Sequence, residues 1–193
     1  MPFSAAAAVA PGAPGVPTAN ERAARLVDAA SVLANESGSS GFTVAQVAER
    51  AGSSLKGFYR CFASKDELLV ALLAAESHTG AAVLGEMVRG RPGDPLHTYV
   101  TGIFELAALP AARGYSRVLV QEHRRLAERQ PAALDAALAP LVDLLARITG
   151  DQRDAQTIFG VVLGGVHDVA LGRGDARETA EYLARFCRRG LDR

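Results

Sequence analysis

The residues best suited to bind another molecule lie between positions 50 and 65, a segment with basic side chains and no acidic one. Both lysines of the chain, Lys56 and Lys65, fall inside it, together with Arg50 and Arg60. Tyr59 stands beside Arg60 and adds a hydroxyl group. Because Lys and Arg neutralise phosphates, this pattern is typical of a short element that contacts a nucleic-acid backbone.

The residues around these cations predict two short helices joined by a tight turn. Thr43 and Gln46 form a capping box at the start of the first helix, and Gly52 permits the left-handed backbone that ends it. Ser53 or Ser54 can cap the second helix, which we expect to reach about residue 61. Helix, Gly-containing turn and helix form the layout of a helix-turn-helix, whose second helix enters the major groove of DNA.

Apolar residues predict which side of the second short helix is buried. Phe58 and Phe62 are four residues apart and give it an apolar side, which Leu55 could extend unless it faces DNA. Ser64 and Glu67 then form a second capping box, at the start of a long third helix. The basic side chains of the segment are therefore expected to point outward.

Residues 41–68, GFTVAQVAERAGSSLKGFYRCFASKDEL, resemble the DNA-binding signature of the tetracycline-repressor (TetR) family of bacterial regulators. The resemblance implies an all-α fold, in which a three-helix, helix-turn-helix DNA-binding domain precedes a helical ligand-binding and dimerisation domain. The run from Leu55 to Arg60 is similar to an actinobacterial-type branch. The matching residues are Gly41, Phe42, Thr43, Val47, Ala48, Ala51, Gly52, Ser54, Phe58, Tyr59, Phe62, Ser64, Lys65, Asp66, Glu67 and Leu68.

The sequence departs from the family pattern at two positions. Ser53 stands where the family usually has Val, and Cys61 where it usually has His or Tyr. Because Cys is a weak hydrogen-bond donor, the second change is expected to remove one phosphate contact. These changes leave an alternative open, in which the protein is a helical module that binds a ligand or a protein and has lost its affinity for DNA.

The resemblance and the side-chain chemistry suggest a role for each residue of the motif. Tyr59, Lys65 and Thr43 are expected to contact phosphates. Lys56 and Arg60 are candidates for base or groove contact, because Lys and Arg read guanine edges. Taken singly, each cation could instead be solvated and each hydroxyl could be a simple cap. The predicted DNA-binding residues are Thr43, Ser53, Ser54, Leu55, Lys56, Gly57, Tyr59, Arg60 and Lys65.

Length and composition fit a helical protein of two parts. The chain has 193 residues, of which 49% are hydrophobic, and a formal net charge of zero, so any basic surface has to be local. We expect a flexible tail over residues 1–17, a DNA-binding domain over 18–78 and an effector-binding and dimerisation domain over 79–193. The tail has no Arg or Lys with which to contact a minor groove.

The chain is expected to be cytoplasmic. No apolar run approaches the roughly 20 residues that span a bilayer, and the Pro-interrupted start lacks the charged region of a signal peptide. Cys61 and Cys187 lie far apart in the sequence, which favours reduced thiols over a disulfide. The four histidines show no metal-ligand spacing, so neither a metal nor a cofactor is expected.

The rest of the chain is helical in pattern, without a credible strand. Thr18 with Glu21, Asp94 with Pro95, and Asp151 are start signals for helices. The charged run from 121 to 129 is interpreted as a solvated helical face. About nine helices are predicted, over residues 18–37, 44–51, 54–61, 64–88, 94–109, 112–129, 131–149, 152–171 and 175–189.

The last two helices carry apolar residues on more than one side. A homodimer that joins these helices in a four-helix bundle would bury them, and a purely intramolecular core is the alternative. Two recognition helices related by a two-fold axis would read a palindromic operator. The predicted dimer-interface residues are Ile158, Val161, Val162, Gly165, Val169, Tyr182, Leu183 and Phe186.

Family members that resemble this chain often bind a small apolar or amphipathic effector, which we expect among residues 94–173. Effector binding would then move the helix that follows Ser64 and release DNA, as in a repressor. No Walker A, GxSxG or dinucleotide pattern is present, so an enzyme is not expected. The predicted effector contacts are Tyr99, Ile103, Phe104, Leu119, His123, Leu163 and His167.

Overall fold

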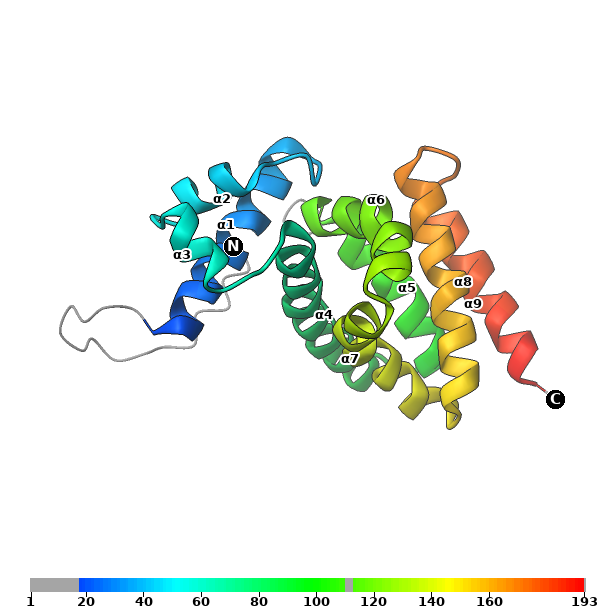
Figure 1. Ribbon diagram of the computed structural model, residues 1–193. Coiled ribbons are helices and arrows are strands. Elements are labelled where there is room, and N and C mark those ends of the chain that lie inside the picture. Colours follow the sequence, from blue (N-terminus) through cyan, green and yellow to red (C-terminus); the bar gives the residue numbers. More distant parts are fainter. Residues whose placement is uncertain (1–17, 110–112, 193) are drawn as a thin grey trace.

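The computed structural model describes residues 18–109 and 113–192, and this part of the chain folds into helices without a strand (Figure 1). The tail predicted over 1–17 lies outside the described residues. The predicted all-α fold class is therefore confirmed. The helices are α1 (Ala19–Ser37), α2 (Val44–Arg50), α3 (Leu55–Tyr59), α4 (Lys65–Gly90), α5 (Pro95–Ala108), α6 (Arg113–Arg129), α7 (Pro131–Thr149), α8 (Gln152–Ala170) and α9 (Ala176–Leu191).

Local caps determine where several helices begin. The Glu21 amide donates to Thr18 Oγ1 at 3.2 Å, and the Thr18 amide donates to the Glu21 carboxylate at 2.8 Å. Asp94 accepts from the Leu96 amide at 3.0 Å, with Pro95 at the first position of α5. These starts agree with the sequence prediction, because each cap is completed within one turn of the helix.

The capping box predicted at the start of α4 is only half formed. The Glu67 amide donates to Ser64 Oγ at 3.2 Å, as expected. The Glu67 carboxylate, however, accepts from the Ala63 amide at 2.7 Å and not from the Ser64 amide. The prediction was therefore wrong about the second bond of the box. Glu67 instead binds the backbone one residue earlier, at Ala63, and still fixes the start of α4.

Helix α4 joins a small amino-terminal unit to a larger bundle. Figure 1 shows α1, α2 and α3 at one end of the molecule and α5–α9 at the other, with α4 between them. α4 packs against α1 as well as α5, α6 and α7, and α6 also reaches α1. Leu26 of α1 and Leu68 of α4 are fully buried, so one hydrophobic core continues from the small unit into the bundle.

Helix α4 comes closer to a membrane span than the sequence interpretation allowed. Of the described helices, it is the one long and apolar enough to cross a bilayer, by length and composition alone. Core helices of proteins meet the same criterion. α4 buries Leu68, Leu69, Leu72, Leu73 and Leu84 inside the protein, which accounts for its apolar composition.

Candidate nucleic-acid interface

Reciprocal hydrogen bonds fix the first helix of the motif, α2, at its start. The Gln46 amide donates to Thr43 Oγ1 at 3.2 Å, and the Thr43 amide donates to Gln46 Oε1 at 2.7 Å. Val47 and Ala48 then turn inward and are buried. Thr43 therefore positions α2, and its contact with a phosphate stays a prediction.

One glycine makes the turn between α2 and α3. Gly52 has a φ of 61°, in the left-handed region. A Cβ at Gly52 would meet nothing within 4 Å, so backbone conformation and not space selects glycine here. The Ser53 amide donates to the Ala48 carbonyl at 2.8 Å and closes the turn. Ser54 then caps α3 by accepting from the Gly57 amide at 3.0 Å.

Phe58 holds the short helix α3 against the rest of the small unit. Its side chain is 0% exposed, and its ring centroid lies 5.7 Å from that of Phe62 and 5.3 Å from that of Tyr59. The opposite side of α3 faces solvent, because Leu55 is 50% and Tyr59 58% exposed. Leu55 thus belongs to the outer side of the helix and does not extend the apolar one.

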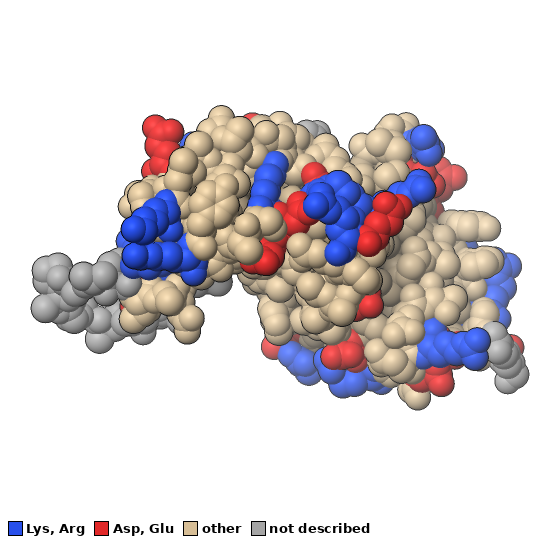
Figure 2. Space-filling model, viewed as in Figure 1, with Lys and Arg blue, Asp and Glu red and all other residues tan. Residues whose placement is uncertain are grey.

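The cations of the basic segment fall into two groups. Arg50 donates to both carboxylate oxygens of Glu36, at 2.8 and 2.7 Å, and this bond raises the pKa of Arg50. Lys65 also has a partner inside the protein. Lys56 and Arg60 are exposed, and the described part of the chain gives neither an acidic partner. Figure 2 shows Lys and Arg side chains gathered near α3.

Lys65 connects the start of α4 to the segment that leads into α2. Its Nζ donates to the Ser40 carbonyl and lies 4.8 Å from the centroid of the Phe42 ring. Burial lowers the pKa of Lys65, and the nearby charge of Glu122 opposes this shift. The DNA-backbone contact predicted for Lys65 stays a prediction; Ser40 takes one of the three donors of the ammonium group.

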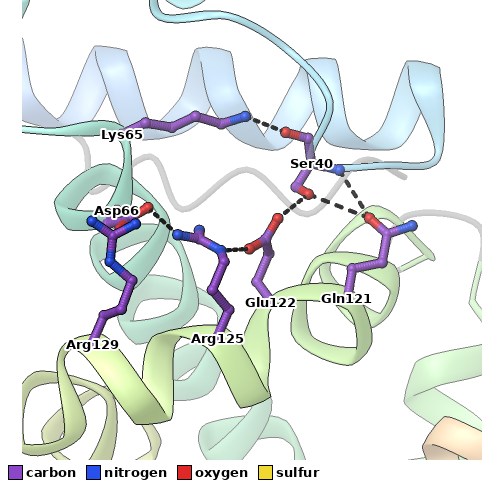
Figure 3. Close-up of polar contacts among 7 residues, drawn as sticks. All are labelled: Ser40, Lys65, Asp66, Gln121, Glu122, Arg125 and Arg129. Carbon is purple, nitrogen blue, oxygen red and sulfur yellow. Dashed lines mark hydrogen bonds and ion pairs between the residues drawn. The ribbon is translucent and has the colours of Figure 1, made fainter.

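A polar network extends from this contact to α6 (Figure 3). The Ser40 hydroxyl donates to Glu122, and the Ser40 amide donates to Gln121 Oε1 at 3.2 Å. Arg125 donates to Glu122 at 2.6 Å and to Asp66 at 2.7 Å. We call the following set the junction network: Ser40, Lys65, Asp66, Gln121, Glu122, Arg125 and Arg129.

The junction network corrects the interpretation of residues 121–129 as a solvated face. The side chains of Glu122 and Arg125 are 14% and 38% exposed, whereas that of Arg124 is 94% exposed. One side of this run therefore faces the small unit and the other faces water. Charged residues on a helix look alike in sequence, and only the neighbouring α4 and Ser40 distinguish the two sides.

A mainly apolar cavity of about 120 Å³ lies among α4, α5, α6, α7 and α8. Three of the predicted effector contacts line it: Ile103, Leu119 and Leu163. Four others do not: Tyr99, Phe104, His123 and His167. Tyr99 is fully buried, and its hydroxyl donates to the Leu141 carbonyl at 3.0 Å. Burial lowers the pKa of His123.

Helix α4 supplies one wall of this cavity, which places part of it outside the predicted range of 94–173. The residues of α4 that line it are Glu76, Thr79, Gly80, Val83 and Leu84. The sequence analysis missed this wall, because a cavity forms between helices and the pattern of one helix does not show which residues will line it. Glu76 was the available signal, since an acidic residue in an otherwise apolar stretch calls for an explanation.

The predicted dimer-interface residues divide by exposure. Within the chain, Ile158, Val162 and Leu183 are already buried, and a Cβ at Gly165 would lie 2.5 Å from Leu183. Val161 and Val169 are partly buried. Tyr182 and Phe186 of α9 are 53% and 49% exposed, with ring centroids 6.2 Å apart in a stacked pair. This aromatic pair is the apolar surface that remains on α9.

Comparison with known proteins gives matches to both the motif and the fold. Residues 26–72 match the model of bacterial regulatory proteins of the tetR family. FadR from Bacillus subtilis, solved with stearoyl-CoA, has 18% identity and a TM-score of 0.68 over 85% of this chain and 96% of its own. A TetR regulator from Rhodococcus sp. RHA1 has 21% identity and a TM-score of 0.67, and the match covers 89% of this chain and 95% of that regulator. RolR in complex with resorcinol has 18% identity and a TM-score of 0.63, and the match covers 91% of this chain and 95% of RolR.

At these identities the similarity to the solved structures concerns the fold. No curated protein sequence matches the chain. The matched residues 26–72 include α2, α3 and the two cations, Lys56 and Arg60, that have no acidic partner among the described residues. Residues 26–72 thus carry the signature of bacterial regulatory proteins of the tetR family, and the fold of the chain is similar to that of solved TetR regulators.

Proposed function

We propose that this regulator is a repressor that binds a palindromic operator as a homodimer and leaves it when a small molecule occupies the cavity. One observation carries the proposal: Lys56 and Tyr59 of α3 and Arg60 at its end face solvent, while Phe58 packs the helix against the core. Regulators of this family bind DNA. The residues proposed to contact it are Thr43, Ser53, Ser54, Leu55, Lys56, Gly57, Tyr59, Arg60 and Lys65.

The DNA-binding part is tested by titrating the protein against the DNA upstream of its own gene. Lys56→Ala and Arg60→Ala should each weaken binding by about 1–3 kcal/mol if they read base edges. Arg124→Ala is the matched control, because it removes the same charge from a side chain that is 94% exposed on α6. Equal affinities for all three variants would contradict the assignment.

Wild-type protein that binds no DNA even at low salt would favour the alternative, a helical module without DNA affinity. Such a module would still bind its ligand, so a ligand titration separates the two functions. Regulators of this family generally act without catalysis, and we propose a non-enzymatic, cytoplasmic protein.

The dimer is supported by the exposed pair Tyr182 and Phe186 and by the open side of α8. A Cβ at Gly160 or Gly164 would meet nothing within 4 Å, so another helix could approach closely there. Tyr182→Glu together with Phe186→Glu should give a monomer in sedimentation experiments. Val32→Glu, at a residue of α1 that is 42% exposed, should leave the dimer intact. A dimer that survives the double change would place the interface elsewhere.

Release by a small molecule is supported by the course of α4. This helix forms a cavity wall near Glu76 and begins at Lys65, inside the junction network. It also runs without a break across residue 78, where we propose that the DNA-binding domain (18–78) meets the effector and dimerisation domain (79–193). RolR was solved with resorcinol, so this fold accommodates a small ring. A ligand that displaces α4 would therefore also move α3, which precedes α4 directly in the chain.

A further inference from the structure

The wall of the cavity carries one ionisable residue among the described residues that line it. This residue is Glu76, and the other polar side chains of the wall are the hydroxyls of Thr79 and Ser116. Thr79 Oγ1 already donates to the Ala75 carbonyl at 3.1 Å. A ligand in this cavity would thus meet an apolar surface with one carboxylate on it.

Glu76 also contacts the DNA-binding unit. Its Oε1 accepts a hydrogen bond from Ser31 Oγ of α1 at 3.2 Å. Burial raises the pKa of Glu76, the Ser31 bond lowers it and the charge of Asp28 raises it further. The carboxylate therefore lies between apolar walls and a second acid, and its hydrogen-bond donor among the described residues is the neutral hydroxyl of Ser31.

We propose that the cavity takes a small apolar molecule with a protonated amine, which binds Glu76 as its counter-ion in place of Ser31. The inference rests on the proposed function, because it assigns a chemical class to the effector of that same cavity. An ammonium group offers charge and hydrogen-bond donors together, so it stabilises a carboxylate in apolar surroundings better than a hydroxyl does. Carboxylate ligands would be repelled.

The size of the cavity limits the apolar part to about one ring. An engineered cavity of roughly 150 Å³ holds a benzene molecule, and this one measures about 120 Å³. The amine would take the carboxylate from Ser31 and so remove a bond between α4 and α1. Ligand binding and the position of the DNA-binding unit are thereby linked through one carboxylate.

Calorimetric titration of the full chain with three probes tests the ligand class. Benzylamine, benzyl alcohol and benzoate share one ring and differ in the charge of the head group. Benzylamine should bind about ten-fold more tightly than benzyl alcohol, and benzoate should bind most weakly. Glu76→Gln should abolish the advantage of the amine. Glu86→Gln, on the same helix with a side chain that is 77% exposed, should leave it unchanged.

A second variant separates the proposed competition from a structural role of Glu76. Ser31→Ala removes the competing donor and should tighten benzylamine binding about three-fold, whereas a purely structural bond would not increase affinity when lost. Any of three results would overturn the inference. Benzoate could bind as tightly as benzylamine, the advantage of the amine could persist in Glu76→Gln, or no probe could bind at all. Operator binding is measured without probes, so a protein that binds benzylamine but no DNA would refute the proposed function alone.

Discussion

The small unit of α1–α3 and the bundle of α5–α9 reach stability in different ways. α2 and α3 have only seven and five residues, and both depend on a capping side chain and on inward-facing apolar residues. α7 and α8 have 19 residues each and bury apolar faces along their length. Because short helices are not stable alone, each anchor in the small unit carries a larger share of the structure. The bundle spreads the same task over many contacts and can leave a cavity open.

The strongest test of this difference replaces one phenylalanine in each region. Phe58→Ala should lower the free energy of unfolding by about 3–5 kcal/mol and abolish DNA binding, because it removes the anchor of α3. Phe159→Ala should cost less, since Phe159 is 9% exposed and already borders the cavity. Urea unfolding measures both values. Equal losses would mean that the small unit is no more dependent on its anchors than the bundle.

The junction between the two regions should show an intermediate effect. Arg125→Ala removes a positive charge that pairs with Asp66 and Glu122. Because the side chains of these two acids are only 13% and 14% exposed, water replaces that charge poorly. We expect a loss of about 1–2 kcal/mol, below the cost of breaking a fully buried ion pair. Arg124→Ala on the solvent side of α6 should change unfolding by less than about 0.5 kcal/mol. Similar values for the two variants would argue that the junction network contributes little.

The smallest effects should come from two glycines and should have opposite signs. Gly52→Ala forces a side chain into the left-handed region and should cost about 1 kcal/mol. Gly80→Ala lies inside α4, where a Cβ would sit 3.8 Å from Leu141, so the gain in helix propensity should stabilise by about 0.5–1 kcal/mol. Thermal unfolding of both variants checks the signs. A neutral Gly52→Ala would show that the turn adapts without strain.

The features predicted correctly from the sequence are those completed within a few residues. The cap at Thr43, the left-handed Gly52 and the start of α5 at Asp94 are fixed by neighbours one turn away. Phe58 is buried as predicted, because its spacing from Phe62 already defines a side of the helix.

The features that were missed depend on which helix lies opposite. Packing between distant segments decides whether Leu55 is buried or exposed. It also decides whether Glu122 faces water or accepts a hydrogen bond from Ser40. The cavity wall on α4 belongs to the same class, since Glu76 faces both the cavity and Ser31 only after the helices have assembled. A single helical pattern contains none of this information.

The internal bonds of Arg50 and Lys65 bear on how many counterions the operator complex can release. In the proposed dimer, Lys56 and Arg60 of both subunits would contribute a slope of about −3.6 to a plot of log affinity against log salt. If Lys65 also neutralises a phosphate, the slope would steepen to about −5.4. The number of ions displaced thus reports whether Lys65, at the start of α4, takes part in binding the duplex.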